Sequence, residues 1–239
     1  MTESGERLVT RAGKIADIGI TKKDLTEEDI AIESGFKDII TQFGPDHVLY
    51  GEEENNLFQT SDNVWVVDPI SSTASFIAGL PHYAIVVAHL IKGSVVFAAV
   101  YDPSVNEMFT AYKGKGAFLN GESIKSSVDQ NKIVFLESAV WKDPEIIIRA
   151  REIIKDYSLE KNKYSFAVNY CWVACGRFDG IVSFTKDSFP EFAGGFIIQE
   201  AGGQFTNIKG ESNIDPADRI FVGGNERVYE DVFEKLKNI

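Results

Sequence analysis

The spacing of apolar and polar positions predicts two helices and then two strands at the start of the chain. Apolar residues recur at helical spacing over residues 3–19, which predicts the first helix. Thr26 and the three acidic residues after it have the sequence of an N-cap and a first turn, so a second helix should run from there to near Phe43. The runs HVLYG and VWVVD predict two strands, which bring Glu52 and Asp68 to their ends.

Residues 84–120 have the pattern of an antiparallel meander, in which short β-branched and aromatic runs are separated by turn-forming pairs. Past residue 130 strands and helices alternate, as is typical of α/β organisation. Strands are expected over KIVFLES, GIVSF and IFVGG, and helices over 143–156, 165–177, 190–202 and from 226 onward. We therefore expect an α+β part over residues 1–128, with an antiparallel sheet and a metal or phosphate loop, and an α/β part over 129–239 that completes a cleft.

Composition narrows the classes of function. The 239 residues include 44% hydrophobic residues, enough to bury a core, and carry a formal net charge of −12. A strongly acidic chain argues against nucleic acid and against an anionic membrane surface as partners, because both need clustered Lys and Arg. The polar N-terminus and the lack of an apolar run of about 20 residues predict a soluble, cytoplasmic protein.

Cysteine and histidine usage does not suggest a disulfide framework or a zinc site. The two cysteines, Cys171 and Cys175, lie four positions apart on a predicted helix and are expected to be buried thiols. The histidines His47, His82 and His89 are scattered over strand positions and are expected to have structural roles.

The segment WVVDPISSTASF combines an apolar strand, an acid at its end and a hydroxyl cluster of Ser71, Ser72 and Thr73. A strand that presents Asp68 to a turn is typical of a metal or phosphate site, yet Mg²⁺ prefers carboxylates to the serines that follow. The hydroxyl cluster has two interpretations that the residues leave open. It could cap a short helix that begins near Thr73, or it could bind an anion.

These residues resemble the inositol monophosphatase family of Mg²⁺-dependent phosphatases. Asp68–Phe76 lies where the family has Asp-Pro-Ile-Asp-Gly-Thr-x-Asn-Phe, and Gly51-Glu52-Glu53 matches an upstream Gly-Glu-Glu triplet. FPEFAGGFIIQEAGG is similar to the second signature, Trp-Asp-x-Ala-Ala-Gly with a Glu-Ala-Gly-Gly end. The resemblance spans nearly the whole chain. It implies a layered αβαβα sandwich of the sugar-phosphatase type, of α+β class, and a homodimer.

The resemblance implies a partial catalytic site. The first metal of the family would be held by Glu52, Asp68 and the carbonyl of Ile70, all of which are retained. Thr73 and Asp29 match the residues that position a metal-bound water or the phosphate. The implied catalytic set is therefore Glu52, Asp68, Thr73 and Asp29.

The second metal site departs from the family pattern. Of its three aspartates only Asp68 is retained, because the second falls on Ser71 and the third on Pro190. Glu191 is adjacent, but a shift of one residue turns a helical side chain by about 100°. Two-metal hydrolysis needs one cation for the water and one for the leaving oxygen. We therefore expect Mg²⁺ at one weak site at most.

The substrate side departs as well. Tyr164-Ser165-Phe166 stands where the family has small residues, and Ser183 stands where members that act on polyols carry an acid. With Pro190 and Glu191, these residues are expected to line the substrate pocket and to reshape it.

Two hypotheses for function follow. In the first, a diverged member binds a small phosphorylated molecule through Ser71, Ser72 and Thr73, and its ordinary Mg²⁺-dependent phosphomonoesterase activity is weak or lost. It then has a binding or regulatory role, or altered chemistry. In the second, the protein is an active metal-dependent phosphatase of a small sugar or polyol monophosphate, with one metal and a compensating group such as Glu191.

Overall fold

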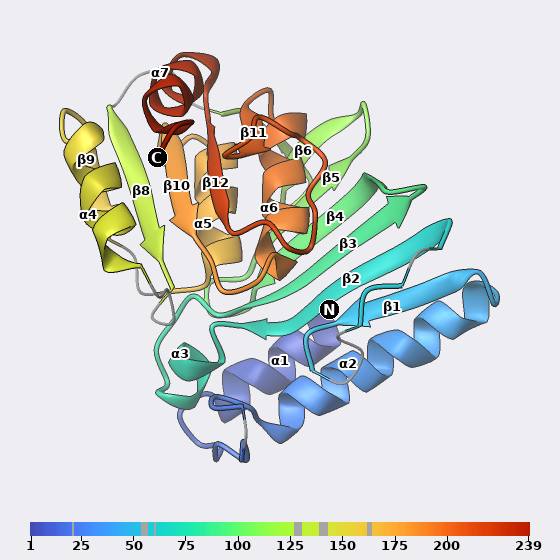
Figure 1. Cartoon of the computed structure of the whole chain (residues 1–239). Helices are drawn as coiled ribbons and strands as arrows, with labels where there is room; N and C mark the ends of the chain where they lie inside the picture. The colour runs from blue at the N-terminus through green and yellow to red at the C-terminus, as the bar shows by residue number, and fades with distance from the viewer. Residues whose placement is uncertain (21, 54–56, 60, 127–130, 139–142, 162–163) are drawn as a thin grey trace.

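Five layers of helices and sheets make up the molecule, which is a computed structural model that describes residues 1–20, 22–53, 57–59, 61–126, 131–138, 143–161 and 164–239 (Figure 1). Helices α1 and α2 cover one face of a seven-stranded sheet. Helices α5 and α6 separate that sheet from a five-stranded sheet, whose far face is covered by α4 and α7. This arrangement confirms the predicted αβαβα sandwich.

The seven-stranded sheet contains the predicted meander. Its strands follow one another in chain order, and only β1 and β2 are parallel. Backbones with positive φ at Lys92-Gly93 and Asn120-Gly121 make two of its tight turns, as the sequence predicts. The strands are β1 (His47–Gly51), β2 (Asn63–Ser71), β3 (Ala84–Ile91), β4 (Ser94–Asp102), β5 (Glu107–Tyr112), β6 (Gly116–Leu119) and β7 (Glu122–Ile124).

The five-stranded sheet has the order β11-β12-β10-β8-β9. Strand β8 pairs in parallel with β9 and β10, whereas β12 is antiparallel to both of its neighbours. The strands are β8 (Lys132–Glu137), β9 (Ser158–Lys161), β10 (Gly180–Phe184), β11 (Gln204–Asn207) and β12 (Ile220–Gly224). The sequence predicts the three central strands but not β9 or β11, because four residues are too few to show a clear alternation.

The helices mostly begin and end where the sequence predicts. They are α1 (Thr2–Arg11), α2 (Glu27–Ile40), α3 (Thr73–Ile77), α4 (Pro144–Ile153), α5 (Phe166–Ala174), α6 (Phe189–Glu200) and α7 (Glu226–Leu236). Thr26 is the N-cap of α2, as predicted, and forms a capping box with Asp29. The predicted helix over 3–19 is wrong past Arg11. Gly13 has a φ of +71° and lies directly against Gly79, which ends α1 there.

The middle layer holds the core. Nearly all residues of α5 and α6 are buried, because both helices are covered by sheets on two sides. Gly194 and Gly195 allow this close packing, since a Cβ at either position would lie 2.3–2.4 Å from the ring of Phe205 or a side-chain atom of Tyr170. Cys171 is buried and Cys175 is partly buried, both as free thiols, which confirms the prediction.

The end of β2 departs from the expected turn at Pro69. Strand β2 continues through Asp68 to Ser71, with an irregular register against β3 over these residues. The chain reverses at Ser72, whose φ of 72° and ψ of 52° lie in the left-handed region, and α3 follows at once. A residue with a Cβ adopts this conformation at a cost of about 1–2 kcal/mol, which explains why the family motif has glycine at this position.

Two further expectations concern the boundary between the two parts of the chain and the absence of a membrane-spanning helix. The predicted boundary between residues 128 and 129 lies outside the described part of the chain. No helix among the described residues has the length and apolar character to cross a membrane.

Candidate functional site

A cavity of about 940 Å³ lies where the ends of β2, β8 and β10 meet the start of α3 and α6. The first part of the chain contributes the predicted residues Glu52, Asp68, Ile70, Ser71, Ser72 and Thr73 to its lining. The second part contributes Glu137, Ser138, Tyr164, Phe166, Thr185, Lys186, Asp187 and Pro190. Residues from both parts of the chain therefore line this cavity.

Glu52 lies between two lysines. Its Oε1 is 3.0 Å from Lys22 Nζ and 2.9 Å from Lys186 Nζ. Burial favours the neutral carboxyl, but the two ammonium groups outweigh it and lower the pKa of Glu52 to about 2. The neighbouring Glu53 also contacts Lys22, at 2.7 Å, while Glu54 lies outside the described residues. Glu52 is therefore a carboxylate whose charge is already paired.

Asp68 is buried beside Glu52 and has one oxygen, Oδ1, without a hydrogen-bond partner among the described groups. Burial and the nearby Glu52 carboxylate raise the pKa of Asp68 well above its ordinary value. Burial and Glu52 likewise raise the pKa of Asp187, which also lines the cavity. These three acids crowd together, and each therefore favours a nearby cation or a proton.

Asp29 and Thr73 form a connected pair beside the cavity. Thr73 Oγ1 lies 3.1 Å from Asp29 Oδ1 and 2.8 Å from the carbonyl oxygen of Ile70, while the N–H of Thr26 donates to Asp29 Oδ2 at 2.8 Å. Burial raises the pKa of Asp29 to about 6, although these hydrogen bonds favour the carboxylate. The pair can orient a water or a phosphate oxygen at Thr73, the role that the family resemblance implies.

The hydroxyl cluster is not arranged as a conventional helix cap. Ser72, the residue before α3, makes no capping hydrogen bond with its side chain, and its hydroxyl instead lies 2.8 Å from that of Ser75. Ser71 Oγ accepts a hydrogen bond of 2.9 Å from Ser165 Oγ. Ser71, Ser72 and Thr73 all line the cavity.

The structure divides the predicted substrate residues into two groups. Tyr164, Phe166 and Pro190 line the cavity, and Ser165 lies directly behind Ser71. The ring of Tyr164 packs edge-on against His82, at 5.0 Å between ring centroids. The aromatic pair therefore forms a wall of the cleft, as the sequence suggests.

Ser183 and Glu191 lie elsewhere, in the core between the sheets. Both are fully buried, and the Tyr170 hydroxyl is 2.6 Å from Ser183 Oγ and 2.7 Å from Glu191 Oε1. Burial raises the pKa of Glu191 to about 8. The helical rotation that separates Pro190 from Glu191 places only Pro190 in the cleft. Glu191 therefore does not reach the place of the missing aspartate.

The sequence interpretation missed Lys22, Lys186 and Asp187. Lys186 and Asp187 follow β10 directly and precede α6, so they lie at the carboxyl end of a strand, where α/β folds place ligands. That position is a signal that the sequence offers. Lys22 lies in a loop before α2, and nothing in its local sequence shows that it reaches Glu52.

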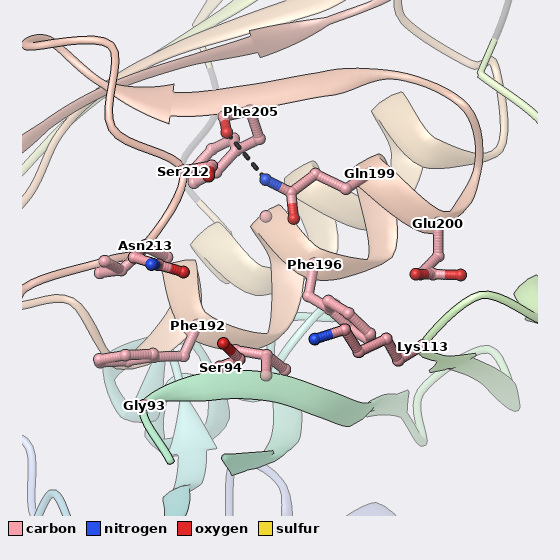
Figure 2. Close-up of a pocket in the computed structure, with 13 residues that line it drawn as sticks. Gly93, Ser94, Lys113, Phe192, Phe196, Gln199, Glu200, Phe205, Ser212 and Asn213 are labelled. Atoms are coloured by element: carbon pink, nitrogen blue, oxygen red, sulfur yellow. Dashed lines mark hydrogen bonds between the residues drawn. The ribbon is translucent and has the colours of Figure 1, made fainter. Parts of the chain in front are cut away.

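A second cavity, of about 190 Å³, lies beside α6 and has both aromatic and polar side chains in its lining, among them Phe192, Phe196 and Glu200 (Figure 2). Two of its polar side chains hold neighbouring backbone segments. The amide of Gln199 donates to the carbonyl of Phe205 at 2.9 Å, and the carboxylate of Glu200 accepts from backbone N–H groups of the β5–β6 turn. The larger cavity is therefore the candidate site.

Comparison with known proteins gives the family. The model of the inositol monophosphatase family matches residues 3–239. The chain belongs to this family. Among solved structures, an IMPase of Thermotoga maritima superposes with a TM-score of 0.84 at 27% sequence identity, over 100% of this chain and 94% of that one. The suhB protein of Bartonella henselae superposes with a TM-score of 0.86 at 22% identity, over 99% of this chain and 95% of that one.

Relatives within the family bear different names. The Nus factor SuhB of Escherichia coli K12 is 32% identical over 221 residues, which cover 90% of this chain and 82% of that protein. A fructose-1,6-bisphosphatase/inositol-1-monophosphatase of Thermotoga maritima is 27% identical over 252 residues, 98% of this chain and 94% of that protein. Since both a Nus factor and a phosphatase are similar to the chain, the residues of the site must decide between functions.

Proteins of this family generally use Mg²⁺, and the residues of this chain do not fit a two-metal arrangement. Ser71 and Pro190 occupy the positions of two carboxylates, and both line the cavity. Of the two retained acids, Asp68 and Glu52, Glu52 is already contacted by two ammonium groups. Among the described residues there is no group of three or more acidic, histidine or cysteine side chains arranged to hold a metal ion.

Proposed function

We propose that this protein binds a small phosphorylated molecule in its cleft and that its Mg²⁺-dependent phosphomonoesterase activity is weak or lost. The observation that carries the proposal is the replacement of two second-metal carboxylates by Ser71 and Pro190, in a cleft where Glu52 is paired with two lysines. Without a second cation the leaving oxygen has no metal to stabilise it. The protein would then have a binding or regulatory role, or would carry out altered chemistry on a related ligand.

Hydroxyl and ammonium groups support the phosphate part of this proposal. Ser71, Ser72 and Thr73 bring three hydroxyl groups to one wall of the cavity, and Lys22 and Lys186 line the same cavity. Hydroxyls and ammonium groups are donors to phosphate oxygens. Glu52, Asp68 and the Ile70 carbonyl would form one weak Mg²⁺ site at most, since a metal ion there competes with the lysines for Glu52.

The alternative function is an active phosphatase of a small sugar or polyol monophosphate. The intact contact between Thr73 and Asp29 favours it, because that pair can position the attacking water. The compensating acid would then be Asp187, which lines the cavity, and not the buried Glu191.

A phosphate-release assay over a panel of sugar, polyol and aryl monophosphates, with and without Mg²⁺, separates the two. We expect release close to the rate without protein for all of them. A kcat of about 1 s⁻¹ or more on any member of the panel, within the ordinary range of enzymes, would establish the alternative.

The small ligand and a second copy of the chain remain the expected partners, in preference to nucleic acid or a membrane, and a cytoplasmic location remains a prediction. The formal net charge of −12 supports the first preference.

Calorimetric titration with Mg²⁺ or Mn²⁺ is expected to show one low-affinity event or none. The reason is that Mg²⁺ needs several charged oxygen ligands, and Glu52 and Asp68 are the two acids of the original set that remain in the cleft. Two tight binding events would contradict the proposal.

Ser71→Asp is expected to weaken phosphate binding about tenfold or more when metal is absent. A carboxylate at this position would repel a phosphate dianion in the same cavity, and no second cation would neutralise it. The measurement is a titration with inorganic phosphate in excess chelator. Ser123→Asp on β7, which adds the same charge at an exposed position, is the control. Equal affinity in Ser71→Asp and wild type would show that the hydroxyl cluster does not contact the anion.

A further inference from the structure

We propose that the ammonium group of Lys186 is the resident cation of this cleft, binding the phosphate group of the ligand where the family relies on Mg²⁺. This inference rests on the proposed function, because it assumes that a phosphate enters the cavity. It adds the group that makes such binding independent of metal. A side chain of the protein thereby supplies part of the positive charge that a metal ion would otherwise provide.

The position of Lys186 supports this role. Its Nζ lies 2.9 Å from Glu52 Oε1 and 3.5 Å from Asp187 Oδ2, and the side chain lines the cavity. Lys186 is placed by the connection between β10 and α6 and lines the same cavity as the hydroxyls that end β2. Half of the side chain remains accessible, so its ammonium group can contact both Glu52 and a ligand in the cavity.

Lys22 is less suited to this role. It contacts Glu52 at 3.0 Å, but its Nζ also lies 2.7 Å from both carboxylate oxygens of Glu53. Three contacts of hydrogen-bond length therefore occupy the ammonium group of Lys22. Lys186 contacts Glu52 more closely than Asp187, which leaves donor capacity for a phosphate oxygen.

The charge of the cleft shows why a resident cation is needed. Five acids line the cavity, and a phosphate dianion beside them would be repelled: Asp24, Glu52, Asp68, Glu137 and Asp187. Lys186 contacts two of these acids directly. It therefore lowers the negative potential of the cavity that the hydroxyl cluster also lines. Removing it would leave Lys22, already bound to Glu53, as the remaining cation at Glu52.

The same contact explains why metal should bind weakly. A Mg²⁺ ion would take the oxygen of Glu52 at about 2.1 Å, and the ammonium group already lies against that oxygen. The ammonium group of Lys186 and a Mg²⁺ ion cannot occupy the position beside this oxygen at the same time. Lys186 and a metal ion therefore compete, and removing the lysine should favour the metal.

The test compares wild type, Lys186→Met and Lys186→Arg by titration with inorganic phosphate in excess chelator and in excess Mg²⁺. In chelator we expect wild type and Lys186→Arg to bind phosphate and Lys186→Met to bind it at least about tenfold more weakly. Lys155→Met, which removes an exposed lysine paired with Glu152 on α4 and its C-terminal flank, should bind like wild type. Equal affinity in wild type and Lys186→Met would overturn the inference.

A second titration, with Mn²⁺ and without phosphate, gives a readout that does not depend on the ligand. Lys186→Met is expected to bind Mn²⁺ at least about tenfold more tightly than wild type. Unchanged metal affinity would contradict the inference that Lys186 and a metal ion compete for Glu52. Thermal unfolding checks that each variant is folded. If Lys186→Met does not fold, the phosphate affinity of wild type, measured in chelator and in Mg²⁺, still tests the inference. Phosphate binding that requires Mg²⁺ overturns the inference and leaves the proposed function, whereas no binding in either buffer overturns both.

Discussion

The variant Ser71→Asp/Ser72→Gly/Pro190→Asp is expected to hydrolyse p-nitrophenyl phosphate in Mg²⁺ about a hundredfold faster than wild type, or more. Positions 71 and 190 both face the cavity, so aspartates there would restore the second metal's ligands. Glycine at 72 removes the strain of a left-handed serine. A second cation that stabilises the leaving oxygen by about 3 kcal/mol accounts for the gain. Release of p-nitrophenol measures it.

Each single substitution is the control for this prediction and should change activity little, because ligands of one metal act as a unit. Adding Lys186→Met to the triple variant should raise metal affinity further, since the lysine contacts Glu52. A folded triple variant that binds two metals without gaining activity would contradict the explanation. It would place the defect in the wall formed by Tyr164 and Phe166.

Glu191→Gln is expected to remove a strong pH dependence from the stability of the fold. Burial raises the pKa of Glu191 from 4.5 to about 8, so the folded state holds this proton between those pH values and the unfolded state releases it. The free energy of unfolding therefore falls as pH rises through this window, by roughly 3–5 kcal/mol in total. Glutamine carries no proton to lose and abolishes this contribution.

Urea unfolding of wild type and Glu191→Gln at pH 5, 7 and 8.5 measures the effect. Several other buried acids titrate as well, so the difference between the two proteins isolates Glu191. Glu152→Gln, at an exposed position, is the control and should follow wild type. Parallel stability curves for wild type and Glu191→Gln would show that Glu191 is not a protonated core residue.

The sequence predicts the fold well where local rules decide it. The capping residues of α2, the meander turns and the apolar faces of the central strands are short-range features, and the structure has them where the pattern indicates. The end of α1 depends on contact between Gly13 and Gly79, far apart in sequence, and was therefore missed. The continuation of β2 through Pro69 depends on its pairing with β3.

The same distinction between local and long-range features applies to the candidate site. Pro190 lines the cavity as expected from the motif, but the expectation that Glu191 lines it too is wrong, because helical geometry turns Glu191 into the core. The contacts of Lys22 and Lys186 with Glu52 join three distant segments, and no local pattern encodes such convergence. Ser183 lies in the core because β10 places it against Tyr170.

The most direct test of the account is a ³¹P NMR experiment on wild type with p-nitrophenyl phosphate, first in chelator and then in excess Mg²⁺. One sample reports both binding, through the shift of the ester signal, and hydrolysis, through the signal of inorganic phosphate. We expect the ester signal to shift in both buffers while inorganic phosphate appears no faster than without protein. Turnover of about 1 s⁻¹ or faster in Mg²⁺, or an ester signal that does not shift in either buffer, would contradict the account.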